Sequence, residues 1–263
     1  MTPAQIQENH RFLDEAGDTT FYGKGKVPII GQNGVSKCFM LGMVKFKAPL
    51  DEVRRQVVAL QKSVSEDRYF ASIPSIQKKE AEGGFFFHAT DDTPEVRKIF
   101  YDYLDRLNCS FEVYVGRKIP GLYERKHNGK EAEFYADLLA HLLKNKLNKE
   151  GDFKLTLASR GKTTRNQNLE LALSKAVERN RKGGMTSQIK FDVQNPRTEP
   201  LLTVPDYFCW AVQRVFERGE TRYYDFMRER ISVVVDLYDI PNYPNYGNYY
   251  SPSKPLTAAN WLK

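Results

Sequence analysis

The 263-residue chain is 41% hydrophobic and 13% aromatic, a composition that allows a sizeable core in one large domain or two small ones and argues against a disordered chain. Its formal net charge of +7 favours polyanions, nucleic acid above all, as partners. No apolar run of about 18 residues occurs, so we expect no membrane-spanning helix.

Three further patterns narrow the class of protein. The first six residues lack the basic and apolar regions of a signal peptide, so we expect a soluble, cytoplasmic protein. Cys38, Cys109 and Cys209 have apolar neighbours and no Cys-x-x-Cys spacing, which indicates buried reduced thiols rather than zinc ligands. The chain lacks Gly-x-Ser-x-Gly and His-Glu-x-x-His, which excludes the hydrolases built on those motifs.

Strands are predicted to open the fold. Residues 11–15 and 27–30 predict short strands, and the apolar run 38–46 predicts a third that is covered on both faces. A helix follows, with Asp51 near its start. Its inner face is predicted to carry Val53, Val57, Val58 and Leu60.

Strands and helices then alternate. Residues 66–83 are polar and predict a loop, and residues 85–90 predict a strand with a polar tip. Thr93-Pro94 begins a helix, since proline suits the first turn, and residues 111–116 alternate as a strand does. The later elements are predicted as helix about 131–147, strand 153–158, helix about 165–181, strand 188–193, helix about 204–217 and strand 231–236.

This alternation predicts an α/β fold with one mixed sheet flanked by helices. Residues 1–239 are interpreted as a single domain, with a possible helical insertion at about 120–182. Residues 240–263 form a tail rich in proline, asparagine and tyrosine, which is either a packed arm or a segment that binds a partner.

The acids near the start are the strongest indication of chemistry. Asp14, Glu15 and Asp18 surround Gly17 just after an apolar lead-in, as at a strand tip that carries carboxylates. Neighbouring strand residues point to opposite faces, so Asp14 and Glu15 cannot both face one side. A turn at Gly17 would return Asp18 to the tip. The alternative is a hairpin whose acids only form the turn.

A divalent-metal nuclease needs further carboxylates from distant elements, because Mg²⁺ prefers oxygen ligands. The best second candidate is Asp206, at the start of a predicted helix. Its alternative role is structural, since Thr203-x-x-Asp206 resembles a capping box. The third contributor is predicted at the tip of residues 85–90, as His88 or the pair Asp91 and Asp92, which are otherwise a structural histidine and helix caps.

A basic loop, Arg160-Gly161-Lys162-Thr163-Thr164-Arg165, follows a predicted strand and opens a helix. Its cations Arg160, Lys162 and Arg165 suit contacts to a nucleic-acid backbone, unless the loop is simply solvated. The Gly-Lys-Thr triplet is not a phosphate loop, because the earlier glycine of that motif would fall at Thr156.

Four stretches together resemble one bacterial family, catalogued as domain of unknown function 3800. They are Phe12-Leu13-Asp14-Glu15-Ala16-Gly17-Asp18, Phe87-His88-Ala89-Thr90, Ser159-Arg160-Gly161 and Leu202-x-x-x-Asp206-Tyr207. The resemblance spans almost the whole chain and implies a ribonuclease H-like fold. It further implies that Asp14, His88 and Asp206 gather around Mg²⁺ or Mn²⁺, with Glu15 or Asp18 assisting and Asp18 a candidate ligand. His88 stands where a carboxylate is usual, and no clear helix-borne glutamate fills the remaining acidic position.

Two functions are therefore expected. The first is a divalent-metal-dependent nuclease or phosphodiesterase, in which Asp14 and Asp206 bind the metal. The second is a catalytically silent module on the same fold, which binds nucleic acid or protein through the basic loop or the tail. The oligomeric state stays open, with a protein partner and a homo-oligomer as alternatives. A role in defence against phage or mobile DNA is an expectation from the kind of family alone.

Overall fold

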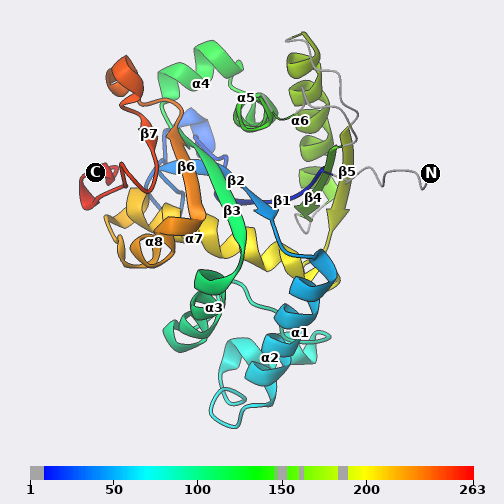
Figure 1. Ribbon diagram of the computed structural model, residues 1–263. Coiled ribbons are helices and arrows are strands. Elements are labelled where there is room, and N and C mark those ends of the chain that lie inside the picture. Colours follow the sequence, from blue (N-terminus) through cyan, green and yellow to red (C-terminus); the bar gives the residue numbers. More distant parts are fainter. Residues whose placement is uncertain (1–8, 145, 147–152, 160–162, 183–188) are drawn as a thin grey trace, which may run out of the picture.

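The computed structural model describes residues 9–144, 146, 153–159, 163–182 and 189–263. In these residues one seven-stranded mixed sheet is flanked by eight α-helices (Figure 1), which confirms the predicted mixed α/β class. The strands are β1 (Asn9–Gly17), β2 (Cys38–Phe46), β3 (Cys109–Arg117), β4 (Phe153–Ala158), β5 (Ile189–Gln194), β6 (Ile231–Asp236) and β7 (Tyr249–Tyr250). The helices are α1 (Leu50–Glu66), α2 (Pro74–Ala81), α3 (Pro94–Arg106), α4 (Pro120–His127), α5 (Glu131–Leu143), α6 (Thr163–Lys182), α7 (Thr203–Arg218) and α8 (Arg222–Met227).

The sheet combines a meander with parallel additions. Its order is β5-β4-β1-β2-β3-β6-β7. Strand β2 runs antiparallel to β1 and β3, whereas β4 is parallel to β1, β5 to β4 and β6 to β3. The carboxyl ends of β1, β3, β4, β5 and β6 therefore lie at one edge of the sheet, where polar loop residues can meet.

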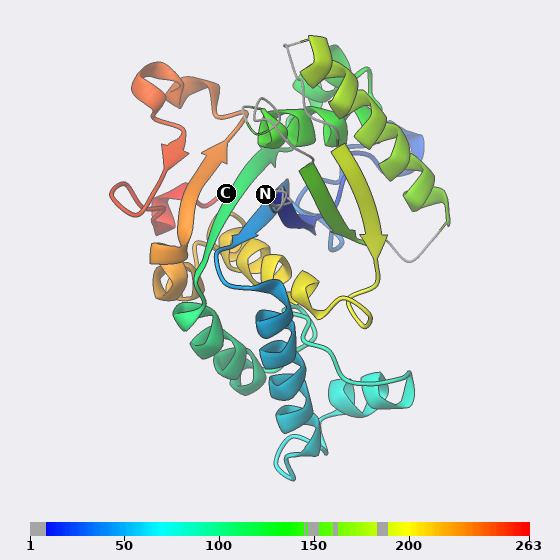
Figure 2. The same ribbon diagram turned by 45° about the vertical axis from the view of Figure 1, so that its right-hand side comes forward.

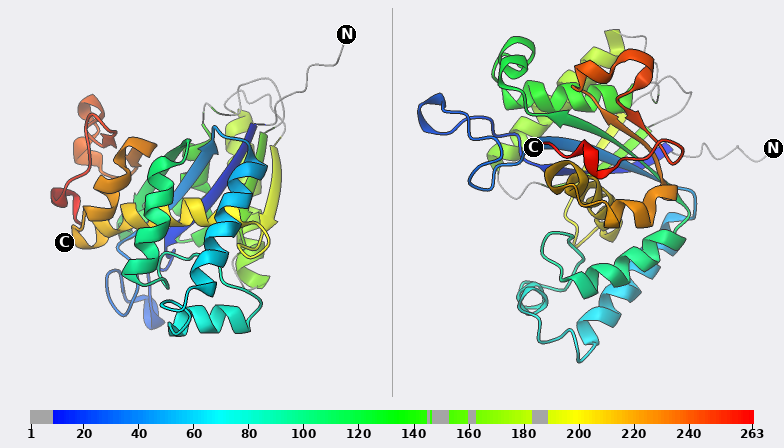
Figure 3. Two further views of the ribbon diagram at one scale, coloured as in Figure 1. Left: turned by 60° about the horizontal axis from the view of Figure 1, so that its bottom comes forward. Right: turned by 90° about the vertical axis from the view of Figure 1, so that its left-hand side faces the viewer.

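Helices cover both faces of the sheet, as the right panel of Figure 3 shows. Helix α7 packs on one face with α1, α3 and α8, in a core that includes Phe12, Met40 and Phe208. Helices α5 and α6 lie over the other face, in a second core that includes Leu13 and Phe39. Helices α1 and α2 extend away from the sheet (Figure 2). None of the helices in the described ranges has the length and apolarity that crossing a membrane requires.

Two predicted strands are wrong. Residues 27–30 contribute only an isolated bridge between Tyr22 and Pro28, after a 3-10 turn at Lys24–Lys26. Residues 85–90, all within the described part, form an irregular segment and no strand. The third strand of the meander is β3, so that α1–α3 are inserted between β2 and β3. The predicted loop 66–83 contains α2, which begins at Pro74.

The tail packs against the sheet. Strand β7 pairs antiparallel with β6, with Tyr250 opposite Val234. The backbone N–H of Leu262 donates to Phe216 at 2.8 Å, and the indole Nε1 of Trp261 donates to the Glu217 carbonyl at 3.0 Å. The tail is therefore an arm that covers the end of α7. The region 120–182 contributes β4 to the sheet as well as helices.

Candidate functional site

A polar pocket of about 310 Å³ lies at the carboxyl end of β1. Its wall combines residues from β1, from the end of β4, from the irregular segment that follows α2, and from α7. The residues are Asp14, Glu15, Ala16, Gly17, His88, Thr90, Ala158, Ser159, Asp206, Trp210 and Gln213. The structure thus brings together four of the predicted site residues, Asp14, Glu15, His88 and Asp206, from three distant parts of the sequence.

Strand alternation distributes the two β1 acids over the two faces of the sheet. Phe12 belongs to the core under α7 and Leu13 to the core under α5 and α6. By the same period of two, Asp14 shares the α7 face and Glu15 the opposite face. Both border the pocket because it lies where the strand ends. The Oδ1 atom of Asp14 accepts the Glu15 backbone N–H at 2.8 Å, which orients this carboxylate.

A glycine lets α7 lie close to Asp14. Gly42 is the β2 partner of Asp14, and a Cβ at this position would overlap the sulfur of Cys209 and the ring of Phe111. The Cys209 thiol instead sits over Gly42 and donates to the Asp14 carbonyl at 3.5 Å. Burial raises the pKa of Cys209, and the negative charges of Asp14, Asp206 and Glu15 raise it further. This thiol therefore stays protonated, as predicted for a buried cysteine.

Asp206 is positioned by a contact across the fold and not by capping its own helix. The N-cap of α7 is Leu202, and the Thr203 hydroxyl donates to the Pro200 carbonyl at 2.7 Å, so the predicted capping box is wrong. The Oδ2 atom of Asp206 instead accepts the backbone N–H of Ala89 at 2.8 Å. Burial raises the pKa of Asp206, while the adjacent His88 and the Ala89 N–H oppose this rise. An opposite charge in the pocket would stabilise the ionised form.

The segment that carries His88 is held by a buried carboxylate. Asp92 accepts the His88 N–H at 2.8 Å, the Tyr207 hydroxyl at 2.5 Å and the Lys79 ammonium at 3.1 Å. Burial raises the pKa of Asp92, although Lys79 and Tyr207 lower it. These contacts assign Asp92 a structural role. The neighbouring Asp91 lies at the surface, with its Oδ2 atom 3.2 Å from Nδ1 of His88.

Asp18 lies away from the pocket wall. Its carboxylate accepts the Lys118 ammonium at 2.8 Å and the backbone N–H groups of Thr20 and Ser36 at 2.8 and 2.7 Å. Burial alone would raise the pKa of Asp18, but these donors lower it below its usual value. The structure therefore pairs Asp18 with Lys118, and Asp18 is not among the residues that line the pocket. Its expected role as a metal ligand stays a prediction.

The structure describes only part of the basic loop. Arg160 and Lys162 lie outside the described residues, and the side chain of Arg165 does so too, although its backbone belongs to α6. Ser159, the residue just before this loop, is described and lines the pocket. The predicted role of these cations in nucleic-acid binding stays a prediction.

The carboxylates suit a hard divalent cation in chemistry but do not form a ready-made cage. Among the described residues, no group of three or more His, Cys, Asp or Glu is arranged to hold a metal ion. The alternation of β1 explains this, because Glu15 belongs to the face opposite Asp14 and Asp206. Mg²⁺ usually binds through one or two carboxylates together with water and substrate phosphate. Asp14 and Asp206 on the α7 face fit that requirement.

Besides two alanines, four further wall residues were not predicted to have a role. Trp210 and Gln213 follow Asp206 at i+4 and i+7, a helical spacing that could have identified them. Thr90 and Ser159 stand in stretches that carry the family resemblance, but nothing in their local sequence separates them from ordinary loop residues.

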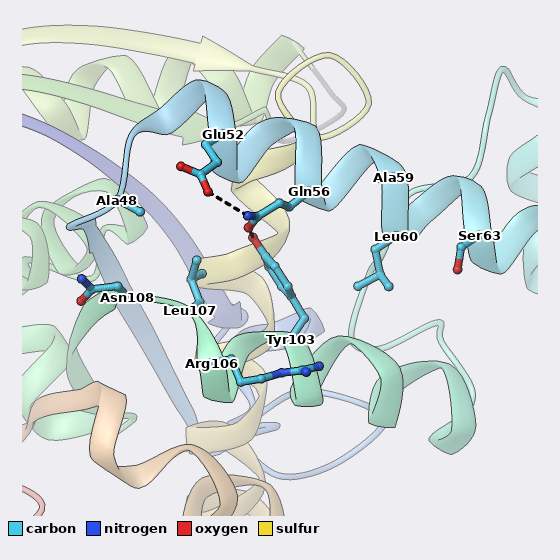
Figure 4. A pocket seen from close by; sticks show the side chains of 10 residues that line it. All are labelled: Ala48, Glu52, Gln56, Ala59, Leu60, Ser63, Tyr103, Arg106, Leu107 and Asn108. Atoms are coloured by element: carbon cyan, nitrogen blue, oxygen red, sulfur yellow. Dashed lines mark hydrogen bonds between the residues drawn. The ribbon is translucent and has the colours of Figure 1, made fainter.

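A second hollow, of about 670 Å³, lies between α1 and α3 (Figure 4) and has a mainly apolar wall. The Tyr103 hydroxyl donates to Oε1 of Gln56 at 3.1 Å, and Gln56 donates to Glu52 at 3.2 Å. Residues of the predicted site do not line this hollow. Four of the predicted site residues instead line the smaller, polar pocket.

Comparison with known proteins adds no relative. A scan of the chain against protein-family models found no match, and a search of curated proteins found no significant one. The assignment of function therefore depends on the geometry of the pocket and on the residues that line it.

Proposed function

We propose that this pocket hydrolyses phosphodiester bonds of nucleic acid with the help of Mg²⁺ or Mn²⁺. The observation that carries the proposal is the convergence of Asp14, Glu15, His88 and Asp206 on one pocket. They come from strand β1, an irregular segment and helix α7, which are far apart in the sequence. A shared pocket is what a catalytic role requires, whereas residues that only form turns or cap helices need not meet.

The fold supports the same proposal. Strands β1, β2 and β3 form a meander, and β4 and β5 join it parallel to β1 through helical connections. This arrangement agrees with the ribonuclease H-like fold that the resemblance to the domain of unknown function 3800 family implies. The acids lie at the carboxyl edge of β1 and β4, where open α/β sheets commonly bind ligands.

In this proposal Asp14 and Asp206 hold the cation, which when bound lowers the pKa of water and stabilises the leaving oxygen. The Asp14 carboxylate is oriented by the Glu15 N–H, and that of Asp206 by the Ala89 N–H. His88 is the residue that exchanges a proton with the substrate. Its side chain is 41% exposed, and because Nδ1 is next to Asp91, the exchanging atom is Nε2.

The test is a cleavage assay on the full chain. Wild type, Asp14→Asn and the control Asp105→Asn, which changes an exposed acid on α3, are incubated with labelled DNA and RNA, single and double stranded. Each mixture contains Mg²⁺, Mn²⁺ or EDTA. We expect cleavage only with metal, and a loss on the order of a hundredfold in Asp14→Asn. The control should cleave at the wild-type rate.

Asparagine retains the Oδ1 acceptor for the Glu15 N–H, so Asp14→Asn should melt at the wild-type temperature. Equal cleavage by wild type and Asp14→Asn would contradict the proposed site. A folded wild-type protein that cleaves none of these substrates with either metal would overturn the catalytic proposal and favour a silent binding module on the same fold.

A further inference from the structure

Helix α7 leaves one stripe accessible, and that stripe starts in the pocket. Most residues of α7 are buried, but Asp206, Gln213, Arg214 and Glu217 are only partly so, and Arg218 at the end of the helix is exposed. Asp206, Gln213 and Arg214 follow the spacing i, i+7 and i+8, with the buried Trp210, 9% exposed, at i+4, which puts all four on one face of the helix. The first three residues along this stripe, Asp206, Trp210 and Gln213, line the pocket. The stripe therefore leads out of the pocket toward the carboxyl end of α7.

Cations and aromatic rings alternate from the pocket onward. The guanidinium carbons of Arg97 and Arg214 lie 4.7 and 5.2 Å from the ring centroid of Trp210. The ring of Tyr223 meets that of Trp210 edge to face at 4.8 Å. Arg222 then lies over Tyr223, with its guanidinium carbon 4.4 Å from the ring centroid. Each of these distances is within the range of a cation–π or aromatic contact.

Helix α8 continues this surface beside α7, as Figure 1 shows. Phe226 follows Arg222 at i+4 and so shares its face of the helix. The Phe226 side chain is 43% exposed, and the ammonium of Lys98 on α3 lies 5.5 Å from its ring centroid. We define the α7–α8 strip as Trp210, Arg214, Arg222, Tyr223, Phe226 and Lys98. Trp210 and Tyr223 are each only 9% exposed and lie beneath Arg214 and Arg222, so Phe226 is the exposed ring of the strip.

We propose that the α7–α8 strip binds single-stranded nucleic acid and leads it into the pocket. This inference rests on the proposed function, because the strip leads to that pocket. The acids of the pocket repel phosphate, so a substrate needs cations beside them. Arg214, Arg222 and Lys98 supply these cations, although Glu220 pairs with both arginines and Asp102 with Lys98.

The exposed ring of Phe226 favours a single strand over a duplex. Bases that are free of pairing can stack on an aromatic ring, and such stacking tolerates any sequence because every base has a π face. A duplex keeps its bases stacked inside and offers mainly phosphates at its surface, and an exposed phenylalanine ring does not bind phosphates. Phe226 between Arg222 and Lys98 is suited to one unstacked base flanked by two phosphates.

The test measures binding apart from cleavage. The anisotropy of labelled single-stranded DNA, single-stranded RNA and duplex DNA of about 16 nucleotides or base pairs is followed in EDTA with the full chain. The strip variant is Arg222→Ala with Phe226→Ala. Its matched control is Arg55→Ala with Tyr69→Ala, an exposed arginine and an exposed tyrosine on and just beyond α1. Melting temperatures verify that both variants fold, and Arg222→Glu provides a second strip variant.

We expect the strip variant to bind single strands about tenfold more weakly or worse, with duplex bound weakly throughout. The slope of log affinity against log salt should also fall by about 0.7, because one phosphate fewer is neutralised by the protein. The control should bind as wild type does. Unchanged binding by the strip variant, an equal loss in the control, tighter binding of duplex, or equal displacement by polyglutamate would each overturn the proposal.

The same samples separate this inference from the proposed function. Single-strand binding that depends on the strip, in a wild-type protein that cleaves nothing with Mg²⁺ or Mn²⁺, would retain the strip and reject the catalysis. Suppose instead that metal-dependent cleavage requires Asp14, but that the strip variant cleaves as fast as wild type and binds single strands as tightly. That result would retain the catalysis and reject the strip.

Discussion

Asp206 combines a half-buried position with an unfavourable charge. Burial raises its pKa, and the opposing effects of His88 and the Ala89 N–H do not cancel that rise. The ionised carboxylate therefore costs stability in the metal-free protein. A residue that destabilises the fold but stays oriented by a distant backbone N–H is typical of a functional site.

We predict that Asp206→Asn abolishes metal-dependent cleavage as fully as Asp14→Asn but does not lower stability in EDTA. Asparagine retains an oxygen for the Ala89 N–H and removes the half-buried charge. Unfolding in urea, with EDTA at neutral pH, should give a free energy equal to or above that of wild type. A markedly less stable variant would mean that Asp206 is mainly a structural residue.

Asp18 should behave in the opposite way. The ammonium of Lys118 is fully buried, and Asp18 neutralises it at 2.8 Å. Asp18→Asn leaves this charge without its counterion, a change that costs about 3–5 kcal/mol at fully buried sites. Because the Asp18 side chain is 36% exposed, we expect the lower end, about 3 kcal/mol, in urea unfolding. Cleavage per folded molecule should stay unchanged, and its loss would restore Asp18 as a metal ligand.

The sequence identified acids that line the pocket, but it did not predict the contacts that hold them in position. Asp14 at a strand end and Asp206 at a helix start could be proposed, because the local pattern marks both elements. Asp18 looked equivalent to Asp14, since its partner Lys118 is 100 residues away. The predicted capping role of Asp206 was also wrong, because Asp206 instead accepts the backbone N–H of Ala89, 117 residues away. Side-chain partners at such separations have no local signature.

At the level of elements, the contact of α7 with β2 sets the distance between the two acids of the α7 face. We predict that Gly42→Ala lowers the free energy of unfolding by about 1–3 kcal/mol, because the added methyl overlaps Cys209 and Phe111. It should also reduce cleavage, since α7 must shift relative to Asp14. Urea unfolding and the cleavage assay measure the two effects.

The matched control is Gly121→Ala in α4. A Cβ there meets only the end of the flexible Arg125 side chain, at 3.5 Å, and alanine favours a helix. This variant should be as stable as wild type or more so. Equal stability of Gly42→Ala and wild type would show that α7 does not need the close approach.

Strong local patterns predicted the elements, and tertiary contacts overrode the weak ones. Strands 153–158 and 231–236 were predicted with their observed bounds, and helix 204–217 within one residue at each end. In α1 the buried residues are Val53, Val57, Gln61 and Val64, so Val58, predicted to face inward, is 49% exposed. Residues 85–90 have a strand-like run of phenylalanines, but their packing and the contacts of Asp92 hold them in an irregular segment.

Across the whole molecule, two buried carboxylates respond to pH in opposite directions. Burial would raise the pKa of Asp137 on α5, but hydrogen bonds from His127, Lys126 and Tyr238 lower it well below its usual value. Asp137 therefore contributes stability that is present above the pKa of the unfolded chain, near 4, and is lost as the pH falls. Burial raises the pKa of Asp236 at the end of β6 to about 6, against the attraction of Arg117.

The sign for Asp236 is reversed, because its folded pKa lies above the unfolded value of about 4. Between pH 4 and 6 the unfolded chain releases this proton while the folded protein retains it, so stability falls as the pH rises. A shift of about two pKa units corresponds to roughly 3 kcal/mol. We predict that the unfolding free energy of wild type minus that of Asp236→Asn decreases by about this amount from pH 4 to pH 7.

Urea unfolding at several pH values measures this difference, and Asp137→Asn supplies the contrast. The difference between wild type and Asp137→Asn should instead be steady above about pH 5 and shrink as the pH falls below 4. A flat difference for Asp236→Asn would mean that Arg117, which also pairs with Asp239 at 2.8 Å, fully offsets the burial of this carboxylate. The combined contribution of these two carboxylates to stability is therefore greatest between the two ranges, where Asp137 is ionised and Asp236 still holds its proton.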